Sequence, residues 1–100
     1  MKKRYLKTKP VCKVTFDLPV AAIGPANKVS LTGDFNNWDV ESTPMKKRKD
    51  GSFTVTVDLP RDAEYQFRYL IDDQRWENDR EADKYIPTPV GGGDNSVIVV

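Results

Sequence analysis

The sequence has 100 residues, 38% of them hydrophobic and 31% charged, a composition typical of one globular domain rather than of a disordered chain. Its formal net charge of +1 gives no strong attraction to nucleic acid or to an anionic membrane, and we expect neither as a partner. A single cysteine and the absence of histidine exclude an internal disulfide and a histidine-based catalytic triad, and we expect no metal site.

The first ten residues are basic and polar and end at a proline. We therefore expect a flexible basic N-terminal arm over residues 1–10, followed by one domain over residues 11–100. The basic start resembles that of a signal peptide, but lysines interrupt the apolar run that a signal peptide needs. No stretch is apolar for long enough to span a membrane. These patterns predict a soluble, cytoplasmic protein.

Short runs with alternating apolar and polar residues follow, separated by Gly, Pro, Asn and Asp. We expect strands at Cys12–Leu18, Val29–Thr32, Met45–Lys49, Phe53–Leu59, Tyr65–Ile71, a short one at Trp76, and Ser96–Val100. Asp50-Gly51 predicts a tight hairpin turn with positive φ. Val20–Asn27 and the charged stretch Asp79–Tyr85 are expected to be loops, the latter with room for one helical turn. Regularly spaced short strands predict an all-β sandwich of about seven or eight strands.

Residues of one parity on successive strands define the predicted core, which consists of Phe16, Leu31, Phe53, Val55, Val57, Phe67, Tyr69 and Val99. On the opposite parity, Arg68 and Leu70 are expected to point outward. The last run is apolar on both parities, which favours an inner strand, or else a truncated chain or a partner that covers one face.

The stretch Gly33-Asp34-Phe35-Asn36-Asn37-Trp38 ends the Val29 strand with residues that turn the chain, because Asp and Asn side chains bond nearby backbone groups. We expect Phe35 to anchor this turn to the core and Trp38 to lie near the surface. A flat ring at a strand end, rimmed by amides, suits a ligand platform. The alternative is that Trp38 folds back as a lid, since Trp is highly buried on average.

Six carboxylates follow the Tyr65–Ile71 strand: Asp72, Asp73, Glu77, Asp79, Glu81 and Asp83. A glycosidase needs two carboxylates that face each other across a cleft. Here they alternate with basic residues in loops, which is typical of a charge-compensated surface. The run Gly91-Gly92-Gly93 lacks the Lys-Ser/Thr of a phosphate loop and precedes a strand. We therefore expect no enzyme activity and no cofactor.

Three motifs, in this order, resemble carbohydrate-binding module family 48: residues 33–38, residues 65–72 followed by Trp76, and Asp94-Asn95-Ser96-Val97. Members of this family are the early-set domains of glycogen branching and debranching enzymes and of the β-subunit of AMP-activated protein kinase. The resemblance covers about Val11 to Val100. It implies an immunoglobulin-like (early-set) β-sandwich that binds α-glucan, such as glycogen, starch or a malto-oligosaccharide, without catalysis.

The resemblance also implies four site residues. Trp38 and Trp76 match tryptophans that stack on glucose rings, whereas Arg68 and Asn95 match residues that bond sugar hydroxyls. The kinase-type domains carry a large apolar side chain shortly before that asparagine, where this chain has three glycines, with Val90 as the nearest candidate. The alternatives are that Arg68 pairs with a carboxylate, Trp76 packs under the charged loop and Asn95 bonds backbone in its turn.

Two other functions stay open. The first is a protein-interaction module that docks on a glucan-metabolising enzyme without appreciable glucan binding, which an exposed Leu70 and the two-sided last strand favour. The second is nucleic-acid binding through Lys46-Lys47-Arg48-Lys49. That run sits at a hairpin with alternating orientation, which is more often a solvated turn than a binding patch.

Overall fold

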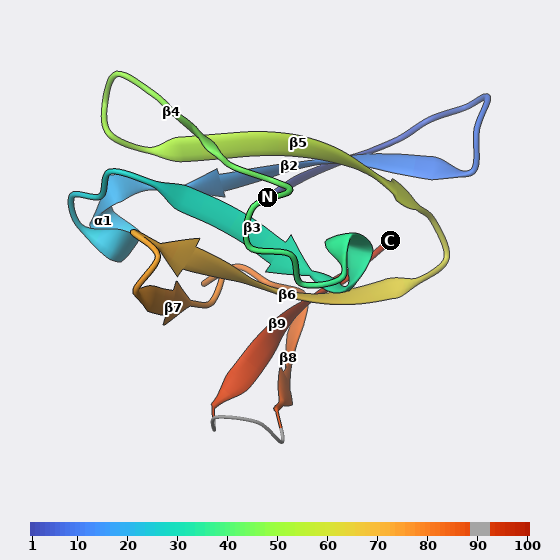
Figure 1. Cartoon of the computed structure of the whole chain (residues 1–100). Helices are drawn as coiled ribbons and strands as arrows, with labels where there is room; N and C mark the ends of the chain where they lie inside the picture. Colours follow the sequence, from blue (N-terminus) through green and yellow to red (C-terminus); the bar gives the residue numbers. More distant parts are fainter. Residues whose placement is uncertain (89–92) are drawn as a thin grey trace.

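The computed structural model describes residues 1–88 and 93–100, which form a β-sandwich (Figure 1). The elements are β1 (Lys2–Tyr5), β2 (Val11–Leu18), α1 (Val20–Ile23), β3 (Val29–Gly33), the 3-10 turn η1 (Asp34–Asn36), β4 (Lys46–Lys47), β5 (Phe53–Pro60), β6 (Glu64–Ile71), β7 (Arg75–Glu77), β8 (Lys84–Pro87) and β9 (Asp94–Val99). The all-β prediction is confirmed, with nine strands among the described residues.

The two sheets are antiparallel and enclose one core (Figure 1). One sheet has the strand order β1-β2-β5-β4, and the other has the order β3-β6-β9-β8, with β7 also paired to β6. In the second sheet β3 lies along one edge of β6. The other edge is shared by β9, beside Glu64–Phe67, and β7, beside Tyr69–Ile71. Three strands, β3, β7 and β9, and the turn after β3 therefore lie around β6.

Alternation decides which side chains enter the core, as predicted. Along β2 every second residue, from Cys12 to Leu18, is buried, whereas the residues between them are partly exposed. Five predicted core residues are buried: Phe16, Leu31, Phe53, Phe67 and Tyr69. Val55 and Val57 are partly buried and pack against this core.

The prediction for Val99 is wrong, because its side chain is 40% exposed, whereas Ile98 is fully buried. Val99 pairs with Glu64 and Ile98 pairs with Tyr65, so it is Ile98 that faces the core. A continuous apolar run has no alternation from which parity can be read. The expected inner position is confirmed, since β9 lies between β6 and β8 and both Val97 and Ile98 are buried.

Residues 1–10 differ from the expected flexible arm. Lys2–Tyr5 forms β1, an exposed edge strand paired with β2. Lys3 Nζ donates to Asp83 Oδ2 at 2.6 Å and to Val99 O at 2.9 Å, which ties this edge to the opposite sheet. Charged residues commonly occupy edge strands, and such a strand shows no apolar alternation in the sequence.

Three connections also differ from the prediction. Val20–Ile23, in an expected loop, forms the single helical turn α1. Among the described residues, no helix is long and apolar enough to cross a membrane. The β4–β5 hairpin is wider than two residues: Gly51, but not Asp50, has a positive φ (89°), and Arg48 N donates to Ser52 O. This is the geometry of a type I turn followed by a bulge. β8 begins inside the predicted charged loop.

A buried polar cluster fixes the segment that follows β7. The Tyr69 hydroxyl donates to Asp79 Oδ2 at 2.6 Å, and both residues are buried. Asp79 N donates to Ser96 Oγ at 2.9 Å, and Ser96 N and Oγ donate to Asn78 Oδ1 at 3.0 and 2.8 Å. The segment after Trp76 is thereby held against β9 by hydrogen bonds.

Tyr69→Phe is expected to destabilise the fold and to change its response to alkali. The substitution leaves the buried Asp79 carboxylate without one donor, which costs about 1–3 kcal/mol. Burial raises the pKa of the Tyr69 phenol well above its ordinary value of 10.0, and the Asp79 charge adds to the shift. Because the folded chain holds this proton more tightly than the unfolded chain, the contribution is complete below about pH 10 and is lost as the pH rises toward the folded-state pKa.

Urea unfolding at about pH 7, 9 and 10.5 measures both effects. The free energy of unfolding of the wild type should fall more steeply above about pH 10 than that of Tyr69→Phe. Tyr5→Phe is the control, because Tyr5 is 45% exposed, and its curve should follow the wild type. Parallel curves for all three proteins would contradict the assignment of this alkaline loss to Tyr69.

Candidate functional site

The candidate site lies on the face of the β3-β6-β9-β8 sheet that points away from the core. Phe67 and Tyr69 are buried inward, so Arg68 and Leu70 on the same strand point outward. Trp76 on β7 pairs directly with Leu70 and therefore lies on this outward face, where 44% of it is exposed. The alternative that Trp76 packs under the charged loop is wrong.

Asn95 lies on the same face. The β6–β9 register pairs Phe67 with Ser96, and one step further along that register it brings Asn95 opposite Arg68. A Cβ at Gly93 would lie 3.6 Å from Arg68 Nη2, so the chain entering β9 passes beside the guanidinium. Asn95 Nδ2 donates to Gln66 Oε1 at 3.0 Å. The alternative that Asn95 bonds backbone in its turn does not match this contact, which is to a side chain on the neighbouring strand.

Trp38 reaches this region through the turn that follows β3. At the end of β3 the backbone of Gly33 runs so close to β6 that a Cβ there would lie 2.5 Å from Gln66 O. Asn36 then holds the turn: its Oδ1 accepts from Gly33 N at 3.0 Å, and its Nδ2 donates to Leu31 O at 2.9 Å and to Thr43 Oγ1 at 3.0 Å. These contacts confirm the expected turn-forming role of the amide.

Phe35 anchors the turn to the core, as predicted. Its ring centroid lies 6.0 Å from that of Phe16 and 6.2 Å from that of Tyr65, and the residue is partly buried. Trp38, three positions later, is partly exposed, and its Nε1 donates to Asp34 Oδ1 at 2.9 Å. The indole is thus held at the sheet edge and does not enter the core.

A tight turn of three residues, 72–74, between β6 and β7 sets the position of Trp76. Asp72 and Asp73 have φ of 51° and 57°, and Gln74 N donates to Ile71 O at 3.0 Å. Two consecutive residues with positive φ match the twist of a tight hairpin. Trp76 is therefore fixed opposite β6 by a turn with little freedom.

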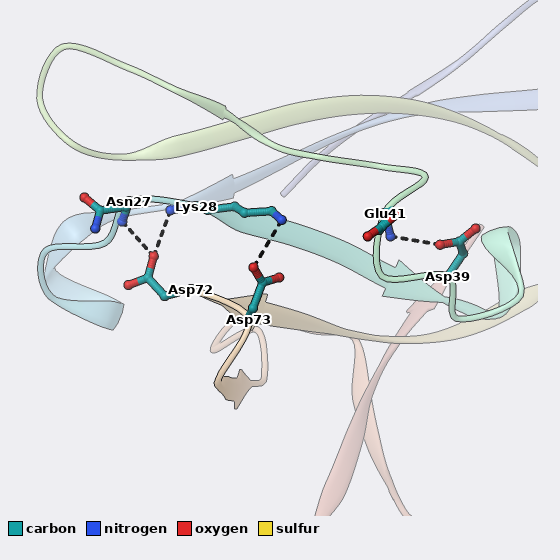
Figure 2. A network of polar contacts seen from close by, with 6 residues as sticks. All are labelled: Asn27, Lys28, Asp39, Glu41, Asp72 and Asp73. Carbon is teal, nitrogen blue, oxygen red and sulfur yellow. Dashed lines mark hydrogen bonds and ion pairs between the residues drawn. The ribbon is translucent and has the colours of Figure 1, made fainter.

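Both aspartates of this turn are bound to the segment before β3 (Figure 2). Asp72 Oδ1 accepts from Asn27 N at 2.8 Å and from Lys28 N at 2.9 Å, and Asp73 Oδ2 accepts from Lys28 Nζ at 3.2 Å. Glu77 on β7 in turn lies 3.2 Å from Arg75 Nη1. These carboxylates act as structural acceptors next to the face, in agreement with the expected charge-compensated surface.

The expectation of an exposed Leu70 is wrong, because only 7% of this residue is accessible to solvent. Its parity was right, but Trp76 on β7 and Ser30 on β3 flank it on this face. An exposed Leu70 therefore gives no support to a protein-docking surface. Instead, Leu70 is a buried apolar residue directly across from Trp76 on this face.

Two residues of the site are absent from the sequence-based prediction. Asp34 accepts the Trp38 indole, and its Oδ2 also accepts from Gln66 N at 2.8 Å; Gln66 in turn accepts from Asn95. The sequence carries one signal for Gln66, which is its outward parity, but none for the contact between Asp34 and the indole. Val90, the nearest candidate for the large apolar side chain, lies outside the described residues, as do Gly91 and Gly92.

One face of the small β-sandwich thus carries an exposed indole, a guanidinium and a carboxamide, and a second, partly exposed indole lies at the edge of the sheet, an arrangement typical of a binding surface. Residues 23–95 match the family described as the glycogen recognition site of AMP-activated protein kinase. The chain belongs to this family, carbohydrate-binding module family 48, whose domains are non-catalytic. The resemblance found in the three sequence motifs is thereby confirmed.

Part of a glucan branching enzyme also matches this chain. The chain is 46% identical over 56 residues to the 1,4-alpha-glucan branching enzyme GlgB of Aquifex aeolicus (strain VF5). The aligned part is 55% of this chain and 9% of that enzyme. The chain thus corresponds to a small part of the length of the enzyme.

Proposed function

We propose that the chain binds α-glucan, such as glycogen, starch or a linear malto-oligosaccharide, on the outward face around β6. Trp38 and Trp76 stack on glucose rings, and Arg68 and Asn95 bond the sugar hydroxyls. The observation that carries the proposal is the β6 register, which puts Trp76, Arg68 and Asn95 on one face while Trp38 borders the same strand through Asp34.

The chemistry of this face suits a neutral sugar polymer. Each glucose ring has an apolar C–H face that an indole can cover, and hydroxyls that need fixed donors and acceptors. Covering on the order of 100 Å² of sugar at roughly 25 cal/mol/Å² gives about 2 kcal/mol per ring before entropy costs. Such a site is weak for one ring and suits a polymer that offers many copies.

The two rings border different parts of β6. Trp38 is linked to Gln66, whereas Trp76 pairs with Leu70. Four residues of strand span roughly 13 Å. The face is therefore long enough for several sugar units, with Arg68 between the two ring positions.

Retention on insoluble amylose is expected for the wild type and tests the proposed function. Because an α-glucan carries no charge, retention should persist when the salt concentration is raised to about 0.5 M. Soluble malto-oligosaccharide should elute the protein by competition. A variant with Lys46 and Lys49 changed to alanine is the matched control. Lys46 lies on β4, in the other sheet, and Lys49 lies just after β4, so this variant should be retained as well as the wild type.

Failure of the wild type to bind amylose would contradict the proposed function. Retention lost on adding salt would point to the basic hairpin and to an anionic partner instead. The second candidate, docking on a glucan-metabolising enzyme, is favoured by the match to a segment that is 9% of a long branching enzyme. If the protein does not bind amylose but co-elutes with a purified branching enzyme, the docking function is favoured.

A further inference from the structure

Asp34, the first residue after β3, uses both carboxylate oxygens to join two segments. Its Oδ1 accepts the indole N–H of Trp38 at 2.9 Å, and its Oδ2 accepts the main-chain N–H of Gln66 at 2.8 Å. Hydrogen bonds to an ionised acceptor are shorter and stronger than bonds between neutral groups. One side chain therefore connects the Trp38 ring to the strand that carries Arg68.

The backbone at Trp38 adopts a conformation that large side chains rarely have. Asn37 and Trp38 both have a φ of 57°, in the left-handed region. For a bulky residue this is an outlier, and it persists only where surrounding contacts hold it. Two contacts do so here: Trp38 N donates to Gly33 O at 2.9 Å, and the indole donates to Asp34. The ring direction thus depends on a contact made by the ring itself.

Gln66 extends the connection to β9. Its main-chain N–H donates to Asp34, and its side-chain Oε1 accepts from Asn95 Nδ2 at 3.0 Å. Hydrogen bonds made by Asp34 and by the main chain and side chain of Gln66 therefore link Trp38 to Asn95. The main-chain and side-chain groups of Gln66 are joined by saturated carbons, so each contact positions its own partner. Two of the four proposed sugar-binding residues are linked in this way without contacting each other.

We propose that Asp34 is a positioning residue that fixes the Trp38 ring in its binding orientation, and that Gln66 does the same for the Asn95 carboxamide. The inference rests on the proposed function, since it assigns roles within the same face. A ring that is already oriented loses less conformational entropy when a sugar binds. Asp34 then raises the affinity without touching the ligand.

A purely structural role for Asp34 leads to a different expectation. The turn itself is held by Asn36, which bonds Gly33, Leu31 and Thr43, and by the Phe35 anchor. Asp34 is exposed and bonds a ring at the edge of the sheet. Loss of its carboxylate should therefore disorder the ring more than the fold.

Four variants separate these roles. Asp34→Ala removes both acceptors, and Asp34→Asn removes one of them while keeping the size of the side chain. Asp39→Asn is the matched control, because it removes the same charge from the same loop and keeps an oxygen for the Glu41 N–H that Asp39 accepts at 2.8 Å (Figure 2). Gln66→Ala keeps the main-chain bond to Asp34 but loses the contact to Asn95.

The first readout is the indole N–H signal in an NMR spectrum, independent of any sugar. The chain has two tryptophans and hence two such signals, which Trp76→Phe assigns. In Asp34→Ala and Asp34→Asn the Trp38 signal should shift and exchange faster with solvent, while the Trp76 signal stays unchanged. Asp39→Asn and Gln66→Ala should leave both signals as in the wild type.

The second readout is the affinity for maltoheptaose. Asp34→Ala should weaken binding by about 3- to 10-fold, the effect of leaving one large side chain to be ordered on binding. Asp34→Asn should lose less, Asp39→Asn nothing, and Gln66→Ala about 2- to 5-fold with an unchanged Trp38 signal. In a Trp38→Ala background, Asp34→Ala should add no further loss, because the ring on which it acts is gone.

Three results would overturn the proposal. One is a Trp38 indole signal that is the same in the wild type and in Asp34→Ala. Another is full affinity in both Asp34 variants while Trp38→Ala binds weakly. The third is an equal loss from Asp34→Ala with and without Trp38. If the wild type does not bind maltoheptaose at all, it is the proposed function that fails, and the indole signal alone then decides whether Asp34 orients the ring.

Discussion

Phe67→Ala is expected to lower the free energy of unfolding by about 3–5 kcal/mol. Phe67 is fully buried at the middle of β6. Its ring packs edge-on against Phe16 at 5.2 Å and against Tyr69 at 5.8 Å between centroids. Truncation therefore removes a whole side chain from a packed cluster and leaves a cavity that two other rings cannot fill.

A loss of this size is a large fraction of the total stability of a small domain, which is about 5–15 kcal/mol. Urea unfolding at neutral pH measures it, and a large part of the variant is expected to be unfolded at 37 °C. Val99→Ala is the control, because Val99 is 40% exposed and should change stability by less than about 0.5 kcal/mol. A Phe67→Ala variant as stable as Val99→Ala would contradict the packing described around β6.

Removing both tryptophans is expected to abolish measurable glucan binding. Trp38→Ala and Trp76→Ala should each weaken binding to maltoheptaose by roughly 1–2 kcal/mol, about the area term lost with one ring, and the double variant by the sum of the two. Calorimetric titration measures these losses. Tyr5→Ala is the matched control, since it removes an aromatic residue that is 45% exposed on the other sheet.

Thermal melts of the same variants test where the rings lie. Trp76 is 44% exposed, so Trp76→Ala should melt close to the wild type. Trp38 is partly buried and bonded to Asp34, so Trp38→Ala should melt somewhat earlier. If Trp76→Ala instead costs about 3–5 kcal/mol of stability, the ring is part of the core and the binding face is wrong.

The sequence was sufficient to predict the elements in which one side of a strand is buried. Alternation in β2 and β6 gave the inward positions of Phe16, Phe67 and Tyr69 correctly, and hence the outward direction of Arg68. The face of Trp76 also follows from the sequence, because the three residues between β6 and β7 leave little choice of register.

Other features depend on partners that no local pattern encodes. β1 is charged and lies at an edge, so its pairing with β2 has no apolar signature. The apolar run of β9 hides its parity, which is why Ile98 and not Val99 is in the core. Leu70 points outward as predicted, yet its neighbours across the sheet bury it.

The contact between Asp34 and the Trp38 indole could not be predicted for a different reason. It requires a left-handed backbone at Asn37 and Trp38, which directs the indole back toward Asp34, four residues earlier in the chain. Nothing in residue type or spacing favours such a conformation for tryptophan. The site thus combines strand positions that follow from alternation with one turn whose geometry only the folded chain shows.

The outward face draws its residues from the turn after β3, from the β6–β7 hairpin and from β9 near the end of the chain. In the unfolded chain these three segments are separated by long stretches of sequence and have no common surface. A bound glucan would bridge them like a removable cross-link, and at a ligand concentration of 100 Kd it would add about 2.7 kcal/mol to stability. Where glucan is abundant, the bound fraction of the chain would be protected, and its rates of unfolding and of proteolysis would fall as the local glucan concentration rises.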